Sequence, residues 1–296
     1  MRISLTTIFL VCAAVYLFAD DLHYVQEIKA WYQQRLENLT QKDGWLSLAG
    51  LYWLEKGENT FGSDASNDIR FPAKADAFIG TFFYDGSTVH VVIKEPSAVI
   101  CKGSTVDTLE LAPDITGDPT VLEQNSLLWY VIVRGDRVGV RLKDTEHANL
   151  TEFEGLDRFP IDKSWKLQAR LVQSDSLRTV KISDVTGLVI NETSPGKLVF
   201  EYQMREYSLV VLGNVNDLHY FLIFADATNG DLTYGGGRYL YVPRVNEQGY
   251  TTIDFNKAYN PPCVFTPYAT CPLPPSQNQL PFPVTAGEKQ YTAKAH

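Results

Sequence analysis

The residues best suited to chemistry gather in one stretch of the chain, residues 226–281. Arg238 follows three consecutive glycines, so its guanidinium would be presented from a sharply bent backbone. A planar guanidinium can bind a carboxylate or a phosphate through two parallel hydrogen bonds. Two interpretations of Arg238 stay open: a structural clamp on a carboxylate such as Asp226 or Asp254, and an anchor for a ligand.

Four further residues of this stretch join Arg238 as candidate binding residues: Tyr234, Asn256, Asn260 and Tyr268. Tyrosine rings can line a groove for a ligand, and they can equally fill a core or its rim. The two aspartates also have two interpretations, general acid–base catalysis and the capping of turns through hydrogen bonds from side chain to backbone. The residue types therefore predict a site around residues 226–271 and leave its chemistry open.

A proline-rich segment closes this stretch. Six prolines fall within residues 261–275, and proline removes a backbone donor, so regular helix or central strand is excluded there. We expect the segment to wrap back over the strands that carry the candidate site and to form one wall of it. Cys263 and Cys271 lie in this segment, and a disulfide between them is the simplest pairing, with reactive thiols as the alternative.

Strand patterns surround the candidate site. Aromatic residues make up 12% of the chain, with 16 Tyr and 15 Phe but only 2 Met, and this composition favours strands over helix bundles. Apolar and polar residues alternate in short runs, of which residues 127–144 form the clearest hairpin, with its turn at Arg134, Gly135 and Asp136. We predict a mainly β fold, an antiparallel β-sandwich or barrel with one N-terminal helix packed on it.

The chain divides into four segments. Residues 1–19 are typical of a signal peptide, because Arg2 gives a positive start to an apolar run that ends at the small residue Ala19. An uncleaved anchor is the alternative interpretation. Residues 20–44 contain a helix with apolar residues three and four positions apart. Residues 45–150 are predicted as a sandwich-like region, and residues 151–296 as a β-rich region with the proline-rich closing loop.

Cleavage after Ala19 would leave no stable membrane span, since no other stretch is long and apolar enough. We therefore expect a periplasmic or secreted protein, in a compartment that permits disulfides. The formal net charge of −9 disfavours the nucleic-acid phosphate backbone, so we predict no nucleic acid as partner. Local metal-binding, phosphate-loop and nucleophile motifs are absent from the sequence, and we predict no metal and no cofactor.

Several motifs together resemble one family of bacterial and archaeal proteins, the domain-of-unknown-function family 1684. They include FEGLDRFP, DATNGDLTYGGGRYLY and AGEK, and the full set occupies residues 44–72, 153–160, 226–241, 254–281 and 286–289. The resemblance covers most of the chain after residue 30. It implies no particular activity, so it adds no mechanism to the candidate residues.

A second resemblance concerns TFGSDASNDIRFP, residues 60–72, which is similar to the opening of a forkhead-associated β-sandwich. In that fold a Gly-Arg pair and a later Ser-x-x-His build the phosphothreonine site. Here Ser63 stands in the place of the arginine, and no Ser-x-x-His follows. The resemblance therefore implies the sandwich shape and not phosphopeptide binding.

Three functions are consistent with these observations. The first is an exported protein that binds a small molecule or a glycan around residues 226–271. The second is a hydrolase that uses Asp226 or Asp254 as acid or base and Arg238 as an anchor. The third is a structural protein of the cell envelope. A concave pocket that joins these three residues would favour the first two, and a buried, mutually bonded cluster would favour the third.

Overall fold

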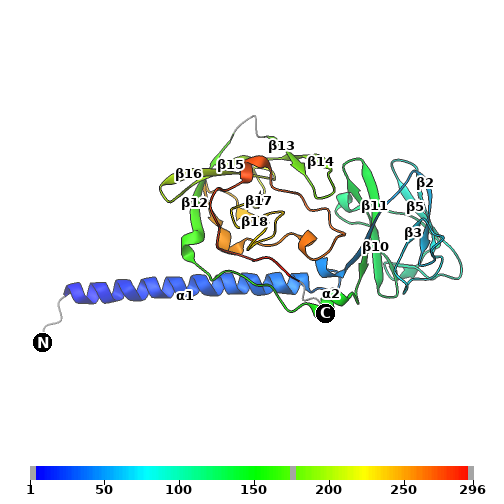
Figure 1. Cartoon of the computed structure of the whole chain (residues 1–296), viewed down its shortest axis with the longest axis horizontal. Helices are drawn as coiled ribbons and strands as arrows, with labels where there is room; N and C mark the ends of the chain where they lie inside the picture. The colour runs from blue at the N-terminus through cyan, green and yellow to red at the C-terminus, as the bar shows by residue number, and fades with distance from the viewer. Residues whose placement is uncertain (1–4, 174–177, 293–296) are drawn as a thin grey trace.

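The chain folds into two β-rich halves, and one long helix runs along the C-terminal half (Figure 1). The computed structural model describes residues 5–173 and 178–292. Within these residues the sheets are antiparallel except for one short parallel pairing, at Phe61 with Ile69. The predicted fold class is confirmed as mainly β, with sandwich-like sheets and an N-terminal helix, and the described residues form no closed barrel.

The N-terminal half contains eleven strands. They are β1 (Leu48–Trp53), β2 (Gly57–Gly62), β3 (Ile69–Arg70), β4 (Gly80–Tyr84), β5 (Val89–Ile93), β6 (Ile100–Cys101), β7 (Ser104–Thr105), β8 (Thr108–Glu110), β9 (Leu122–Gln124), β10 (Leu127–Arg134) and β11 (Arg137–Asp144). The short 3-10 helix η1 (Trp45–Ser47) precedes β1, and η2 (Asp114–Thr116) lies between β8 and β9. One sheet has the order β1-β11-β10-β9-β6-β7 and the other β3-β2-β4-β5-β8.

Aromatic packing between these two sheets makes the first core. Trp129 of β10 is fully buried and contacts Phe61 and Phe71 edge to face, with ring centroids 6.0 and 5.4 Å away. The predicted hairpin of residues 127–144 is confirmed, since β10 pairs with β11 from Leu127–Asp144 to Arg134–Arg137. Alternation along β11 sends Val138, Val140 and Leu142 to this core, and Arg137, Arg141 and Lys143 to the opposite face.

The C-terminal half contains eight strands. They are β12 (Lys166–Val172), β13 (Thr179–Ser183), β14 (Val189–Thr193), β15 (Gly196–Tyr202), β16 (Arg205–Val211), β17 (His219–Phe224), β18 (Arg238–Pro243) and β19 (Tyr250–Asp254). The short helices are α2 (Ala148–Glu152), η3 (Lys163–Trp165), η5 (Phe255–Lys257), η6 (Pro262–Val264) and η7 (Ser276–Asn278). β16-β15-β12-β19 form one sheet, and β13-β14 and β17-β18 form two hairpins.

The β17–β18 hairpin is buried on both faces. One face packs Leu222 and Phe224 against the four-stranded sheet. The other face packs Ile223 and Tyr239 against the β13–β14 hairpin and against Leu48 of β1. Because Leu48 belongs to the N-terminal half, this second cluster joins the two halves through apolar contacts.

The N-terminal helix α1 (Leu5–Leu39) begins earlier than the predicted residues 20–44 and ends sooner. The apolar run before residue 20 contains no proline or glycine, so nothing in it interrupts the helix. Tyr24, Ile28 and Leu39 are buried against the C-terminal half and share one helix face. Within the described ranges, none of the helices combines the length and the apolarity needed to cross a membrane.

The proline-rich segment wraps over the β17–β18 hairpin, as its composition predicts. Backbone hydrogen bonds join Ala225 to Asn278 and Leu280 at 2.9 and 2.8 Å, and the Tyr239 hydroxyl donates to the carbonyl of Pro272. Asn278 is 1% exposed, and its side chain bonds both backbone groups of Val210 and the carbonyl of Ile223. The side-chain amide of Asn278 thereby adds to the few backbone hydrogen bonds that this segment forms with the strands.

Candidate functional site

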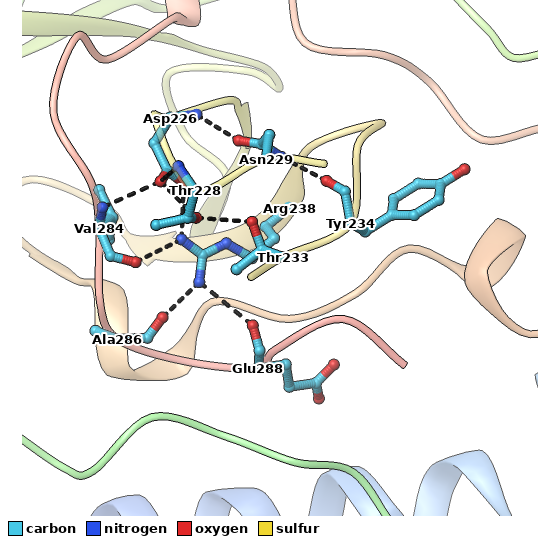
Figure 2. A network of polar contacts seen from close by, with 9 residues as sticks. All are labelled: Asp226, Thr228, Asn229, Thr233, Tyr234, Arg238, Val284, Ala286 and Glu288. Carbon is cyan, nitrogen blue, oxygen red and sulfur yellow. Dashed lines mark hydrogen bonds and ion pairs between the residues drawn. The ribbon is translucent and has the colours of Figure 1, made fainter. Parts of the chain in front are cut away.

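Asp226 and Arg238 form a fully buried ion pair beside residues 284–288, which we call the last segment (Figure 2). The Arg238 Nη2 atom lies 2.8 Å from Asp226 Oδ2, and both side chains have 0% exposure. Burial lowers the pKa of Arg238, and the Asp226 carboxylate opposes that effect. An arginine next to a carboxylate keeps its charge, so the pair is ionic.

The remaining hydrogen bonds of the Arg238 side chain go to backbone carbonyls of residues 284–288, and those of the Asp226 carboxylate go to Thr228 and to the backbone of Val284. Arg238 donates to the carbonyls of Val284 at 2.8 Å, Ala286 and Glu288 (Figure 2). Asp226 accepts from the backbone of Thr228 at 2.9 Å and of Val284 at 3.1 Å. These contacts favour the interpretation of Arg238 as a structural clamp. Its guanidinium holds residues 284–288 against β18 and is fully buried, so it is not accessible to a ligand.

The glycines before Arg238 serve the close packing of this clamp. Only Gly237 of the three has a positive φ, 88°, and a Cβ there would lie 2.4 Å from Pro274 Cγ. The loop between β17 and β18 is closed by side chains, with Asn229 donating to the carbonyl of Tyr234. The ring of Tyr234 points away from the network (Figure 2). Gly237 therefore lets the proline-rich segment approach the backbone next to Arg238.

Asn260 lies in a second buried network, which includes α1. Glu288 is 1% exposed, and its carboxylate accepts from the Asn260 backbone at 2.7 Å and from Arg35 Nε at 3.2 Å. Arg35 also donates to the Asn260 carbonyl and stacks over the ring of Tyr259 at 4.7 Å. Burial raises the pKa of Glu288, and Arg35 opposes that shift. The network fixes α1 to the last segment of the chain.

Asp254 and Asn256 lie in a third network, which holds the other part of α1. Tyr24 of α1 donates to both Asp254 oxygens at 2.9 and 3.1 Å. Asn256 is 1% exposed and donates to Tyr24 and to the Asp162 carbonyl. The Asp254 carboxylate also caps η5, by accepting from the Asn256 backbone. None of these hydrogen bonds reaches Asp226 or Arg238, so the three candidate catalytic residues do not share one network.

Tyr268 and the two cysteines border the apolar cluster that joins the halves. Tyr268 is half-buried against this cluster, on the side of the N-terminal half near Tyr52. Cys263 and Cys271 form a disulfide with a Cα–Cα distance of 6.1 Å. Cys101 is free and partly buried. The disulfide closes the tip of the proline-rich segment, where backbone ladders are lacking.

Replacing Cys263 with serine is expected to raise hydrogen exchange in residues 260–275 far more than in β17, because the disulfide constrains only the segment's tip. The expected loss of stability is about 2–3 kcal/mol. Exchange followed by mass spectrometry on both proteins measures this. An equal rise in β17 would contradict the prediction and would make the segment an integral part of the core.

A cavity of about 670 Å³ lies between the two halves. Its walls come from the β10–β11 hairpin, the β13–β14 hairpin, the β17–β18 hairpin and the disulfide-bonded tip. The two hairpin tips approach closely, since a Cβ on Gly135 would lie 3.1 Å from a methyl group of Leu188. The lining is mostly apolar, and its residues include Trp45, Ile190, Phe221, Tyr239, Tyr241, Ala269 and Cys271.

A second pocket of about 530 Å³ adjoins this cavity, because Trp45 and Tyr241 line both. Helix α1 forms one of its walls with Trp31 and Arg35. Tyr241 and Tyr259 stack there with ring centroids 6.3 Å apart. Burial raises the pKa of Tyr259, so this hydroxyl stays protonated at neutral pH. The two hollows together form an aromatic basin bounded by α1 and both halves, which we call the interdomain basin.

Basic residues of the β10–β11 hairpin line the interdomain basin. Arg141 and Lys143 lie two residues apart on one face of β11, and Arg134 lies on β10. Arg134 is paired with Asp114 at 2.7 Å. Acidic residues line the opposite wall of the cavity, at Asp184, Glu192 and Asp217. In residues 5–173 and 178–292, no three His, Cys, Asp or Glu side chains come together as metal ligands.

The candidate catalytic and binding residues named from the sequence do not line either hollow. Tyr239, Tyr241 and Cys271 line the cavity and fall within residues 226–271, whereas Trp45, Arg134 and Arg141 lie outside that range. A signal for the basic wall does exist in the sequence. Charged residues alternate with valine and leucine along residues 137–143, which places several cations on one face of a strand. That this face meets a second domain is decided by tertiary packing.

One family model matches the C-terminal half of the chain. Residues 151–289 match the model of a family described as "Protein of unknown function (DUF1684)", so the resemblance identified in the sequence is confirmed for this part of the chain. No curated protein matches the chain. The family description gives no activity, and the candidate residues in the C-terminal half gain no role from it.

Solved structures provide more distant likenesses. An uncharacterized protein of Haloarcula marismortui is 27% identical, with a TM-score of 0.40, over 49% of this chain and 80% of that one. The FHA domain of FhaA, in complex with an intracellular domain, is 15% identical with a TM-score of 0.22, over 31% of this chain and 97% of that one. Another FHA structure, from a study of phosphothreonine-dependent interactions, is 15% identical with a TM-score of 0.22, over 31% and 92%.

Proposed function

We propose that this protein is exported and binds a small molecule or a short glycan in the interdomain basin. The single observation that carries the proposal is the cavity of about 670 Å³, whose lining is aromatic and apolar with a few polar groups. Ligand pockets commonly have this size and composition, and they often lie where two domains meet. Part of the predicted range 226–271 lines this basin, namely Tyr239, Tyr241 and the disulfide-bonded tip.

Export is supported by the first residues of the chain and by the disulfide. Arg2 and the apolar run up to Ala19 are typical of a signal peptide. The Cys263–Cys271 disulfide suits a periplasmic or extracellular compartment, because thiols stay reduced in the cytosol. Neither Asp226 nor Asp254 lines the cavity, so the geometry adds no support to a hydrolase that uses these carboxylates.

A thermal-shift screen of metabolites and short glycans against the purified protein tests the proposal. Compounds that raise the melting temperature are then measured on Ile190→Trp, which places an indole in the cavity from β14. Val189→Trp is the matched control, because Val189 precedes Ile190, is 55% exposed and lies on the opposite face of the strand.

We expect the hits to bind the wild type and the control and to lose affinity for Ile190→Trp. Hits that bind all three proteins equally would place the ligand elsewhere and contradict the proposal. The absence of any stabilising compound in a broad screen would count against small-molecule binding itself.

A further inference from the structure

Arg141 is a buried cation that forms no ion pair with any carboxylate of the described residues. The residue is 3% exposed, and no carboxylate of residues 5–173 and 178–292 forms an ion pair with it. Its side-chain hydrogen bonds go to hydroxyl groups, of Thr270 at 3.4 Å from Nη2 and of Tyr130, and its Nε atom has no partner. Removing a guanidinium from water without a compensating charge costs several kcal/mol.

The surroundings of Arg141 compensate this cost only in part. The nearest cation, Arg134, also donates to the Thr270 hydroxyl, at 3.2 Å, so that oxygen is shared between two guanidinium groups. Trp45 lies under Arg141 at 5.7 Å and offers only the face of its ring. Burial lowers the pKa of Arg141, and Arg134 lowers it further, while Tyr130 and Asp114 act in the opposite sense. An arginine keeps its proton through such shifts.

Lys143 extends this cationic wall on the same face of β11. Its ammonium donates to the backbone carbonyl of Asp43 and lies 5.5 Å from the ring of Tyr130. No carboxylate of the described residues lies within ion-pair distance of it. Arg141 lines the cavity of about 670 Å³ and Lys143 lines the adjoining pocket, on either side of Trp45. Two cations without counter-ions therefore face one aromatic basin.

We propose that the ligand of the interdomain basin carries one anionic oxygen group, a carboxylate or a phosphate, that Arg141 binds as its missing counter-ion. Lys143 adds a second positive charge, and the aromatic rings of Trp45, Tyr241 and Phe221 hold the apolar part of the ligand. The acidic residues on the opposite wall oppose a polyanion, so the ligand has a single small anionic group. This inference rests on the proposed function and assigns the chemical class of its ligand.

Isothermal titration calorimetry with three probes that share a phenyl ring tests the inference: phenylacetate, its neutral isostere phenylacetamide, and phenyl phosphate. Arg141→Met is the test variant. Arg137→Met is the control, because Arg137 lies on the same strand face but packs over Trp53, at 3.8 Å, and does not line the cavity. A charged hydrogen-bonded contact accounts for about 10- to 100-fold in affinity.

We expect at least one anion to bind the wild type and Arg137→Met about 10- to 100-fold more tightly than it binds Arg141→Met. The two anionic probes distinguish a carboxylate from a phosphate. The amide should bind weakly and equally to all three proteins. We also expect unliganded Arg141→Met to be at least as thermostable as the wild type, because methionine removes an uncompensated buried charge.

Two outcomes would overturn the inference, and they differ from failure of the proposed function. If the amide binds as tightly as the anions, and Arg141→Met leaves all three affinities unchanged, the basin binds small molecules without selecting for negative charge. If Arg141→Met is strongly destabilised without ligand, Arg141 is a structural residue. If none of the three probes binds and the metabolite screen is also empty, the binding function itself fails.

Discussion

Replacing Arg238 with methionine is expected to lower the free energy of unfolding by about 3–5 kcal/mol, the usual loss when one partner of a buried ion pair is removed. The Asp226 carboxylate would stay at 0% exposure without its cation. Three backbone carbonyls, of Val284, Ala286 and Glu288, would also lose a donor. Urea denaturation of the variant and the wild type measures the difference.

A surface ion pair provides the control for this experiment. Lys257 and Glu27 lie 2.6 Å apart with 26% and 42% exposure of their side chains. Lys257→Met should therefore cost no more than about 1 kcal/mol. Asp226→Asn should be nearly as harmful as the Arg238 variant, because it leaves a buried guanidinium unpaired. A small effect of Arg238→Met would contradict the clamp and would return Arg238 to the candidates for ligand binding.

Replacing Arg35 with methionine is expected to destabilise the protein by about 2–3 kcal/mol at pH 8, and by less at pH 5. The reason is the carboxylate of Glu288, which is 1% exposed and has Arg35 as its ion-pair partner. Burial already raises the pKa of Glu288, and loss of the cation that opposes this shift raises it further.

The sign of the pH dependence follows from this direction. A carboxyl group with a folded-state pKa above its unfolded-state value takes up a proton when the chain folds, between the two pKa values. The free energy of unfolding therefore falls as the pH rises from the unfolded-state pKa of Glu288 to its folded-state pKa. The gap between these two pKa values is wider in Arg35→Met than in the wild type. Thermal unfolding between pH 5 and pH 8 measures the difference.

The control for this second prediction is the double variant with Glu288→Gln. It removes the titrating group, so the extra loss at pH 8 should disappear. A loss in Arg35→Met that is the same at both pH values would refute the electrostatic explanation. It would then assign the effect of Arg35 to its packing over Tyr259 and its hydrogen bond to Asn260.

The sequence predicted what depends on local pattern. The strand-rich fold and the hairpin of residues 127–144 follow from alternation and turn residues, and the wrapping of the proline-rich segment follows from its missing donors. The position of the helix start did not follow, because the apolar run before residue 20 is as suited to a helix as to a targeting segment.

The site was harder to predict because long-range packing decides which charges are paired. Arg238 and Arg141 are both buried arginines on strands, and only the fold shows that Asp226 neutralises the first while nothing described neutralises the second. Asp254 and Asp226 are both aspartates at the ends of predicted strands, yet the first bonds Tyr24 of α1 and the second bonds Arg238. Residue type and spacing cannot distinguish such partners.

The contact between Arg35 and Glu288 joins residues 253 positions apart in the chain. During synthesis Arg35 leaves the ribosome well before Glu288, so α1 cannot form this contact until residues 284–288 have been made. The contact of Tyr24 with Asp254, 230 positions later, is delayed in the same way. A ribosome-bound chain that stops before residue 284 therefore lacks the segment that Arg238 and Arg35 hold. Docking of α1 on the C-terminal half is thus a long-range event that follows the synthesis of residues 254–288.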